Sequence, residues 1–218
     1  MSKKIMTLFM IAFVLFLSLV INTSPVYAYA YNSDFISVIH YQNIGTSDAT
    51  IQIDIYDDTG HLTNYAPVST LAPNAATSLY AGTISGIPSG FKGSAVISSD
   101  QPLASTVAQA GSGQVKNQPL SNGFSSSETA PSVLIPTVLK NMFFFNSVFS
   151  VQNVDSSVAD LRFIFKTTTG AETIYDVDNV QPQSSFLVDM GTTPAISTST
   201  YNGSVVIEAR KDGTPTTS

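Results

Sequence analysis

The feature of this 218-residue chain that constrains its fold most is an internal repeat. Residues 37–43 read SVIHYQN and residues 147–153 read SVFSVQN, a shift of 110 positions (43 to 153). The shift holds well beyond this motif and slips to 109 near the middle of each copy. Self-similarity over so long a stretch indicates one structural unit present twice. The other matched residues are Ala49 with Ala159, Thr59-Gly60 with Thr169-Gly170, Pro73 with Pro182, Gly82-Thr83 with Gly191-Thr192, and Gly93-Ser94 with Gly203-Ser204.

Hydrophobic alternation predicts that each copy is built of β-strands. In residues 50–56 isoleucine occupies every second position, which is the period-two pattern of a half-buried strand. Leucine and phenylalanine alternate in the same way in the matching residues 159–165. Short strands with turn-forming residues about every eight to twelve positions predict an antiparallel, immunoglobulin-like β-sandwich. The chain has no Cys and no Trp, so it is not a true immunoglobulin domain.

The N-terminus has the pattern of a secretory signal peptide. Lys3 and Lys4 precede an apolar run over residues 5–21, and small residues follow at Ala28 and Ala30. We therefore expect cleavage after Ala30, with Ala28 as the alternative site. A retained membrane anchor is the competing interpretation, because the apolar run is about long enough to span a bilayer. The expected location is extracellular or at the cell surface.

These patterns predict an all-β chain with two tandem antiparallel immunoglobulin-like β-sandwich domains after a signal peptide. The expected boundaries are a signal peptide over residues 1–30, a first repeat over 31–110, a polar linker over 111–130 and a second repeat over 131–218. The linker is rich in Gly, Ser, Asn and Gln, which favours a flexible connection.

The two copies differ at their edges. The second copy begins with an apolar strand at residues 133–138, whose counterpart in the first copy falls inside the signal peptide. The first copy ends with a strand at residues 103–107, and the second copy lacks this last strand. Three interpretations stay open: the ends vary or the sequence is a fragment; the linker residues Val115, Leu120 and Phe124 fill a gap; or copies of the chain self-associate through their sheet edges by exchanging strands.

The charge balance limits the classes of partner. Removal of Lys3 and Lys4 with the signal peptide leaves 7 basic residues against 15 acidic ones, a net charge of −8. An acidic, thinly charged surface disfavours nucleic acid and anionic lipid surfaces as partners. We expect no stable membrane insertion after cleavage, and surface glycans or other envelope proteins as the partners.

The sequence offers few residues for chemistry. The two histidines, His40 and His61, have no histidine at the matching positions, and no nucleophile or metal-protease motif occurs. We therefore expect no catalytic residues and no cofactor. Asp54, Asp57 and Asp58 form the one weak calcium candidate, since Ca²⁺ prefers oxygen ligands. The alternative is a solvated hairpin turn, where aspartate is common.

Several residues that recur at matching positions are interpreted as structural markers rather than as ligands. The amides of Asn43 and Asn153 can satisfy backbone groups at the end of a strand. The recurring glycines suit turns and bends. The full set of markers is Gln42, Asn43, Gly60, Gly93, Gln152, Asn153, Gly170 and Gly203.

Aromatic residues are the remaining indication of a binding surface. Residues 142–145 read MFFF, the most apolar short loop of the chain. We expect this loop to cover one end of a sandwich or to lie between domains; an exposed loop would instead be a docking patch. The tyrosines are expected to pack at the rim of the sandwich, with sugar stacking as the alternative.

The recurring pattern resembles a repeat found in tandem in large secreted and cell-surface proteins of bacteria. It reads Tyr41-Gln-Asn43, Ala49, Gly60, Leu71-Ala-Pro73, Phe91-Lys-Gly-Ser-Ala-Val-Ile97 and Asp100-Gln-Pro-Leu-Ala104. The resemblance covers nearly all of the mature chain and implies an immunoglobulin-like extracellular module without an active site. The expected function is a non-enzymatic structural or adhesive module. A carbohydrate-binding module is the alternative, and part of a secreted hydrolase is a weaker one.

Overall fold

The structure is a computed structural model, and it describes residues 35–65, 70–111, 120–211 and 214–215. The predicted signal peptide and its cleavage site lie outside the described residues. Val115 of the predicted linker also lies outside them.

The described chain is an all-β protein whose strand pairings are all antiparallel, which confirms the predicted fold class. Two short 3₁₀ turns, η1 (Ala81–Thr83) and η2 (Ser126–Glu128), complete the described secondary structure. The strands are β1 (Phe35–Asn43), β2 (Ile51–Asp57), β3 (Gly60–Tyr65), β4 (Ala76–Tyr80), β5 (Ser94–Ser99), β6 (Leu103–Gly111), β7 (Leu120–Asn122), β8 (Ser132–Lys140), β9 (Val148–Gln152), β10 (Ala159–Thr167), β11 (Glu172–Val180), β12 (Ser185–Asp189), β13 (Tyr201–Lys211) and β14 (Thr214–Pro215).

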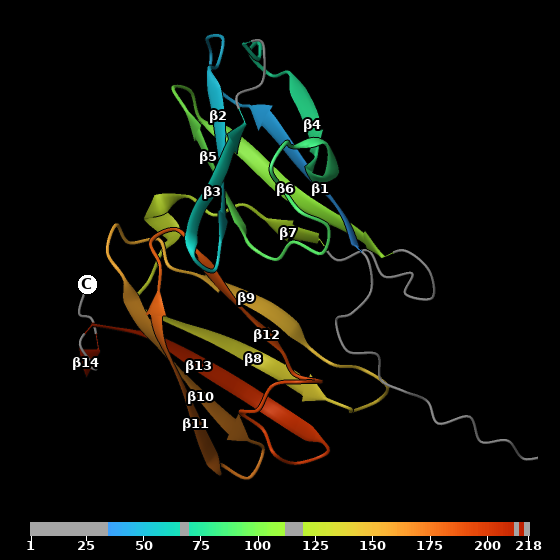
Figure 1. The fold of residues 1–218 in the computed structure, drawn as a ribbon, viewed down its shortest axis with the longest axis vertical. Coiled ribbons are helices and arrows are strands. Elements are labelled where there is room, and N and C mark those ends of the chain that lie inside the picture. Colours follow the sequence, from blue (N-terminus) through green and yellow to red (C-terminus); the bar gives the residue numbers. More distant parts are fainter. Residues whose placement is uncertain (1–34, 66–69, 112–119, 212–213, 216–218) are drawn as a thin grey trace, which may run out of the picture.

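The strands form two pairs of sheets, one in each half of the described chain (Figure 1). In the first half, the sheet β4-β1-β6-β7 accompanies the sheet β3-β2-β5. In the second half, the two-stranded sheet β12-β9 accompanies a sheet in which β11, β10 and β13 are neighbours and both β8 and β14 pair with β13.

Each half has its own hydrophobic core, and the alternating rows of the sequence supply both. In the first half, Ile51, Ile53 and Ile55 of β2 point inward, and all three are buried. At the matching positions of β10, leucine and phenylalanine are buried in the same way. The predicted alternation is therefore confirmed in both halves, with an aliphatic row in one and a largely aromatic row in the other.

The two halves differ at their edges. β1 pairs with β4 on one side and with β6 on the other, whereas its counterpart β9 pairs only with β12 among the described residues. Conversely, β13 pairs with β8, whereas its counterpart β5 pairs only with β2 within the described part of the chain.

The described linker residues do not fill either of these edges. The short strand β7 pairs with β6, so it extends the first sheet on the far side of β6. Leu120 and Phe124 are both strongly exposed. Of the three interpretations left open, the one in which the linker fills a gap is therefore wrong for Leu120 and Phe124, because these side chains pack into neither core.

Phe163 lies at the centre of the second core, so its removal tests that core directly. Its side chain is fully buried, and its ring lies 5.9–6.4 Å from the rings of Phe149, Phe165, Tyr175 and Phe186. We expect Phe163→Ala to lower the free energy of unfolding by about 3–5 kcal/mol, measured by urea denaturation. The exposed Ile174 gives a control, since Ile174→Thr keeps a β-branched residue and should cost less than about 1 kcal/mol. Equal losses for the two variants would contradict this assignment.

Candidate functional site

A buried asparagine ties together the loops at one end of the first half. The side chain of Asn43 is fully buried at the end of β1. Its Nδ2 donates to the carbonyl oxygens of Ser47 (2.7 Å) and Leu71 (2.8 Å), and its Oδ1 accepts from the N–H of Gly45 (2.8 Å). One side chain thus satisfies three backbone groups from two loops, which would otherwise be buried without partners.

Asn153 makes the same three contacts in the second half. Its Nδ2 donates to the carbonyl oxygens of Ser157 (2.8 Å) and Val180 (3.0 Å), and its Oδ1 accepts from the N–H of Asp155 (3.0 Å). Each of these partners lies at the position that matches a partner of Asn43. The two networks are therefore equivalent in chemistry as well as in sequence.

The preceding glutamine also recurs with its contact. Gln42 Nε2 donates to the carbonyl oxygen of Asn74 (3.0 Å), and Gln152 Nε2 donates to that of Gln183 (2.8 Å). Asn74 and Gln183 match each other, and both have a positive φ, of 60° and 62°. All four amide side chains of the Gln-Asn motif are occupied by the protein's own backbone, which supports their architectural role.

The recurring glycines occupy two kinds of position. Gly60 and Gly170 have positive φ angles of 130° and 86° in the turns after β2 and β10, where glycine avoids the steric cost of a side chain. Gly93 and Gly203 lie against the neighbouring strand. A Cβ atom at either position would lie only 2.2 Å or 2.1 Å from a backbone carbonyl oxygen of β2 or β10.

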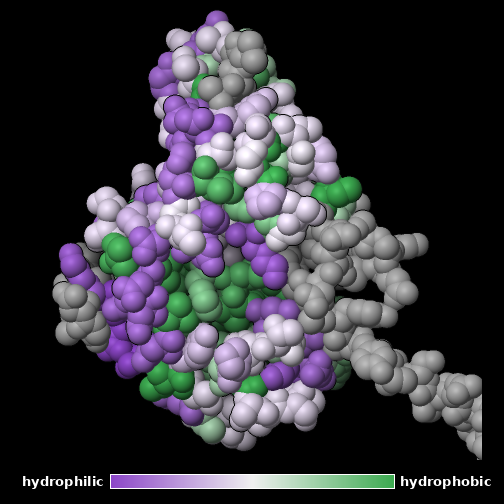
Figure 2. Space-filling model, viewed as in Figure 1, coloured by the Kyte–Doolittle hydropathy of each residue, from purple (hydrophilic) through white to green (hydrophobic). Residues whose placement is uncertain are grey.

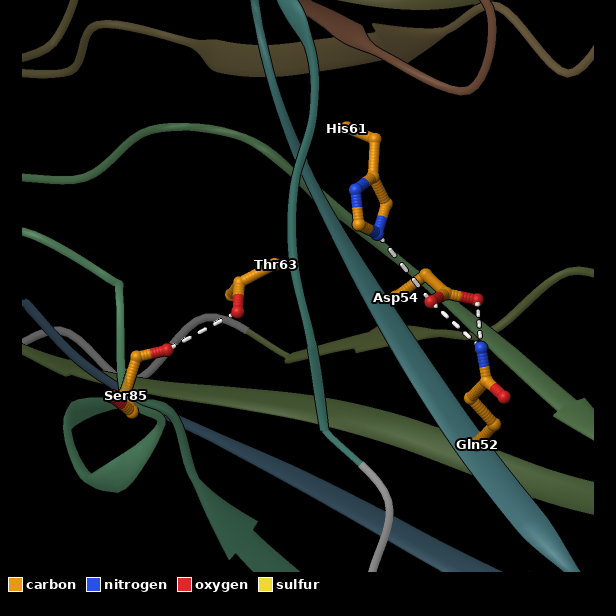
Figure 3. Close-up of polar contacts among 5 residues, drawn as sticks. All are labelled: Gln52, Asp54, His61, Thr63 and Ser85. Atoms are coloured by element: carbon orange, nitrogen blue, oxygen red, sulfur yellow. Dashed lines mark hydrogen bonds and ion pairs between the residues drawn. The ribbon is translucent and has the colours of Figure 1, made fainter.

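The predicted calcium ligands Asp54, Asp57 and Asp58 lie on the β2–β3 hairpin. Figure 3 draws Asp54 with its neighbours Gln52 and His61. Asp54 Oδ1 lies 3.5 Å from His61 Nε2 and accepts a hydrogen bond from Gln52 Nε2 (2.9 Å). Asp57 accepts from both the hydroxyl (2.7 Å) and the N–H (2.8 Å) of Thr59. These bonds hold the pKa of the Asp57 carboxyl below its ordinary value.

The structure does not assemble these carboxylates into a metal site. Among the described residues, no group of three or more His, Cys, Asp or Glu side chains could hold a metal ion. The calcium candidate formed by Asp54, Asp57 and Asp58 is therefore corrected. The carboxylate of Asp54 contacts His61 on the neighbouring strand and accepts a hydrogen bond from Gln52. The carboxylate of Asp57 accepts a hydrogen bond from Thr59 within the turn, so the two carboxylates bind protein groups and do not share one metal position.

A small pocket lies where the two halves meet. Its volume is about 210 Å³, and Lys92 of the first half lines it together with residues around β12. The rings of Tyr175 and Phe186 form its aromatic side, with their centroids 6.4 Å apart. Close to this junction, the hydroxyl of Ser94 donates to the carbonyl oxygen of Gln183 (2.7 Å), which joins the two halves.

The loop between β8 and β9 is a tight turn that exposes three phenylalanines. Met142 and Phe145 exchange backbone hydrogen bonds of 3.2 Å and 2.8 Å, and Phe143 and Phe144 between them have φ angles of 52° and 68°. Two consecutive positive φ angles are typical of a type I′ turn, which normally contains Asn-Gly. For phenylalanine this conformation costs roughly 1–2 kcal/mol per residue. The side chains of Phe143, Phe144 and Phe145 are 70%, 77% and 62% exposed.

Two asparagines fix the base of this aromatic turn. The N–H of Asn141 donates to Asn146 Oδ1 (2.8 Å), and Asn146 Nδ2 returns a bond to Asn141 Oδ1 (3.2 Å). Asn141 Nδ2 also donates to the carbonyl oxygen of Ser199 (2.8 Å). The expectation that residues 142–145 cover a sandwich end or lie between domains is wrong, because the turn projects its rings outward. The run of apolar residues identified this loop in the sequence, but no residue pattern predicted the strained backbone of Phe143 and Phe144.

Comparisons with models of protein families, with curated protein sequences and with solved structures returned no match. Within the described residues, no helix has the length and apolar character needed to cross a membrane.

Removal of the buried amide tests whether the Gln-Asn motif supports the fold. We expect Asn153→Ala to lower the free energy of unfolding by about 2–3 kcal/mol, because buried carbonyl groups lose their donor. Hydrogen exchange should accelerate in residues 154–158 and 180–184. The exposed Asn122 on β7 provides the control, since Asn122→Ala should change stability by less than about 0.5 kcal/mol. Unchanged stability of Asn153→Ala would contradict the proposed role.

Proposed function

We propose that this protein is a non-enzymatic structural or adhesive module made of two tandem β-sandwich repeats, secreted or held at the cell surface after removal of its signal peptide. The observation that carries the proposal is the exposed aromatic turn of residues 142–145. The two halves share their backbone-binding amides and glycines, so these residues serve the fold. The described residues of the first half contain no counterpart of the aromatic turn, and the side chains of the turn contribute to neither core.

The strained backbone of the turn supports a role in contact with another surface. A left-handed phenylalanine costs stability, and such strain concentrates at functional sites. The asparagines at the base hold the rings in an outward orientation before any partner arrives, which reduces the entropy lost on binding. Residues 141–154 contain no charged residue, so the turn can leave water without burying a charge.

The double substitution Phe143→Asn with Phe144→Gly tests this role, because it replaces the strained pair with the preferred residues of a type I′ turn. We expect the free energy of unfolding to rise by about 1–2 kcal/mol. We also expect the amount of protein retained on the surface of producing cells to fall at least about tenfold, since each buried phenylalanine contributes roughly 1.5–3 kcal/mol. Urea denaturation and quantitative blotting of the cell-surface and medium fractions measure the two effects.

A matched control for retention is Ile174→Thr, which removes an exposed apolar residue from a sheet face. This variant should be retained like the wild type. Undiminished retention of the Phe143→Asn, Phe144→Gly protein would show that the turn is not the adhesive contact. Accumulation of the wild-type protein inside the cell with residues 1–30 still attached would overturn the extracellular assignment.

The pocket at the junction favours a carbohydrate-binding module as the second candidate. An aromatic side formed by Tyr175 and Phe186, together with polar residues such as Thr192 and Thr193, suits the stacking and hydrogen bonding of a sugar ring. Calorimetric titration with soluble oligosaccharides tests this function. Saturable binding that is lost in Lys92→Ala and kept in Lys166→Ala would support it, and the absence of heat for every glycan would exclude it in favour of the adhesive module.

A further inference from the structure

The burial of inward-facing residues depends on a strand that one half has and the other lacks. Ile39 and Tyr41 of β1 face the first core and are only 5% and 4% exposed. Phe149 and Val151 occupy the matching positions of β9 and also pack against their core, yet they are only half-buried. The difference follows from β6, which pairs with β1 along residues 35–43, whereas the described part of the chain places no strand at this edge of β9.

The other sheet of each half shows the same relation between burial and a neighbouring strand, but here the second half has the additional strand. Val205 and Ile207 of β13 are buried, and β8 pairs with this stretch of the strand. Ala95 and Ile97, at the matching positions of β5, are only half-buried, and β5 pairs with β2 alone among the described residues. Burial thus follows the presence of a neighbouring strand in both comparisons, whichever half supplies the residue.

Apolar side chains of β9 are only partly covered, since Phe149 and Val151 are half-buried. Figure 2 shows a recess of hydrophobic atoms near the middle of the face, at the level where Figure 1 draws β9 and β12. A strand edge offers a row of backbone donors and acceptors, and an apolar groove beside it offers side-chain pockets. Together these are the two elements of recognition by β-strand addition.

We propose that the open edge of β9 is a binding site for an extended polypeptide segment with the side-chain pattern of β6, bound antiparallel to β9. The first half shows how such a segment sits. Opposite β1, Leu103 faces Asn43 and Val107 faces Ile39, and both Leu103 and Val107 pack on the core. The polypeptide segment that binds to β9 should therefore have two apolar residues four positions apart, with a small residue midway between them.

The charge pattern agrees with this occupant. Residues 103–111 of β6 read LASTVAQAG and carry no charge, and β9 itself is uncharged. The bound segment is not β6 itself, because β6 already pairs with β1 over nine residues. Its transfer to β9 would expose the edge that it now covers.

A synthetic peptide with the sequence of residues 101–111, QPLASTVAQAG, is the probe. We expect saturable one-to-one binding to the full-length protein by fluorescence anisotropy. Hydrogen exchange should slow at the amides of β9 and stay unchanged at those of β5. A control peptide with aspartate in place of the residues equivalent to Leu103 and Val107 should bind at least about tenfold more weakly, since it loses the burial of two apolar side chains.

Backbone methylation separates strand addition from general apolar binding. Alternate residues of an antiparallel strand direct their N–H groups to the same neighbour. Of two peptides that are N-methylated at alternating positions in opposite phase, one should lose binding at least about tenfold and the other should keep most of it. Equal affinities of the two peptides would overturn the proposal.

Two further results would also overturn it. The first is protection of β5 instead of β9 when the peptide binds. The second is a dimer, seen by light scattering, in which the β9 amides are already protected without peptide, because the occupant would then be the same edge of a second copy.

Joining the peptide sequence to the C-terminus through a flexible linker gives an independent measurement. The melting temperature should rise by about 4 °C or more, and a scrambled sequence of the same composition should leave it unchanged.

Discussion

The rest of the structure depends on two buried asparagine side chains. A sandwich end brings together loops whose backbone groups no strand can pair, and leaving such groups buried without partners costs about 1–3 kcal/mol each. Asn43 and Asn153 satisfy these groups with one amide in each half, through contacts that match one for one. The loops are therefore fixed from inside, and the outer surfaces and edges of the sheets remain free to differ.

The strands could be predicted from the sequence because the relevant forces are local. Alternation in residues 50–56 and 159–165 indicated which side chains face a core, and Ile53 and Phe163 are indeed fully buried. The recurrence of the Gln-Asn motif indicated where the two halves correspond. The backbones of the two halves also correspond at Gly93 and Gly203. Each of these glycines lets the chain pass close to a carbonyl oxygen of the neighbouring strand, β2 or β10.

The candidate site could be predicted only in part, because it depends on geometry that residue types do not encode. The sequence identified residues 142–145 as apolar, but the left-handed conformation of Phe143 and Phe144 arises from the tight turn that connects β8 to β9. The proximity of Asp54 to His61 depends on strand register. The half-burial of Phe149 depends on which strands pair with β9. Patterns of single residues carry no information on such pairings across strands.

The different core rows of the two halves have a consequence for how the chain folds. Two similar units on one chain are at risk of exchanging equivalent strands during folding, which is a characteristic failure of repeated domains. Here β2 supplies isoleucines and β10 supplies leucine and phenylalanines at the same positions. An exchanged β10 would overfill the first core, and an exchanged β2 would leave cavities in the second. The mismatch in side-chain volume therefore favours correct pairing, although the backbones of the two halves are held in the same way.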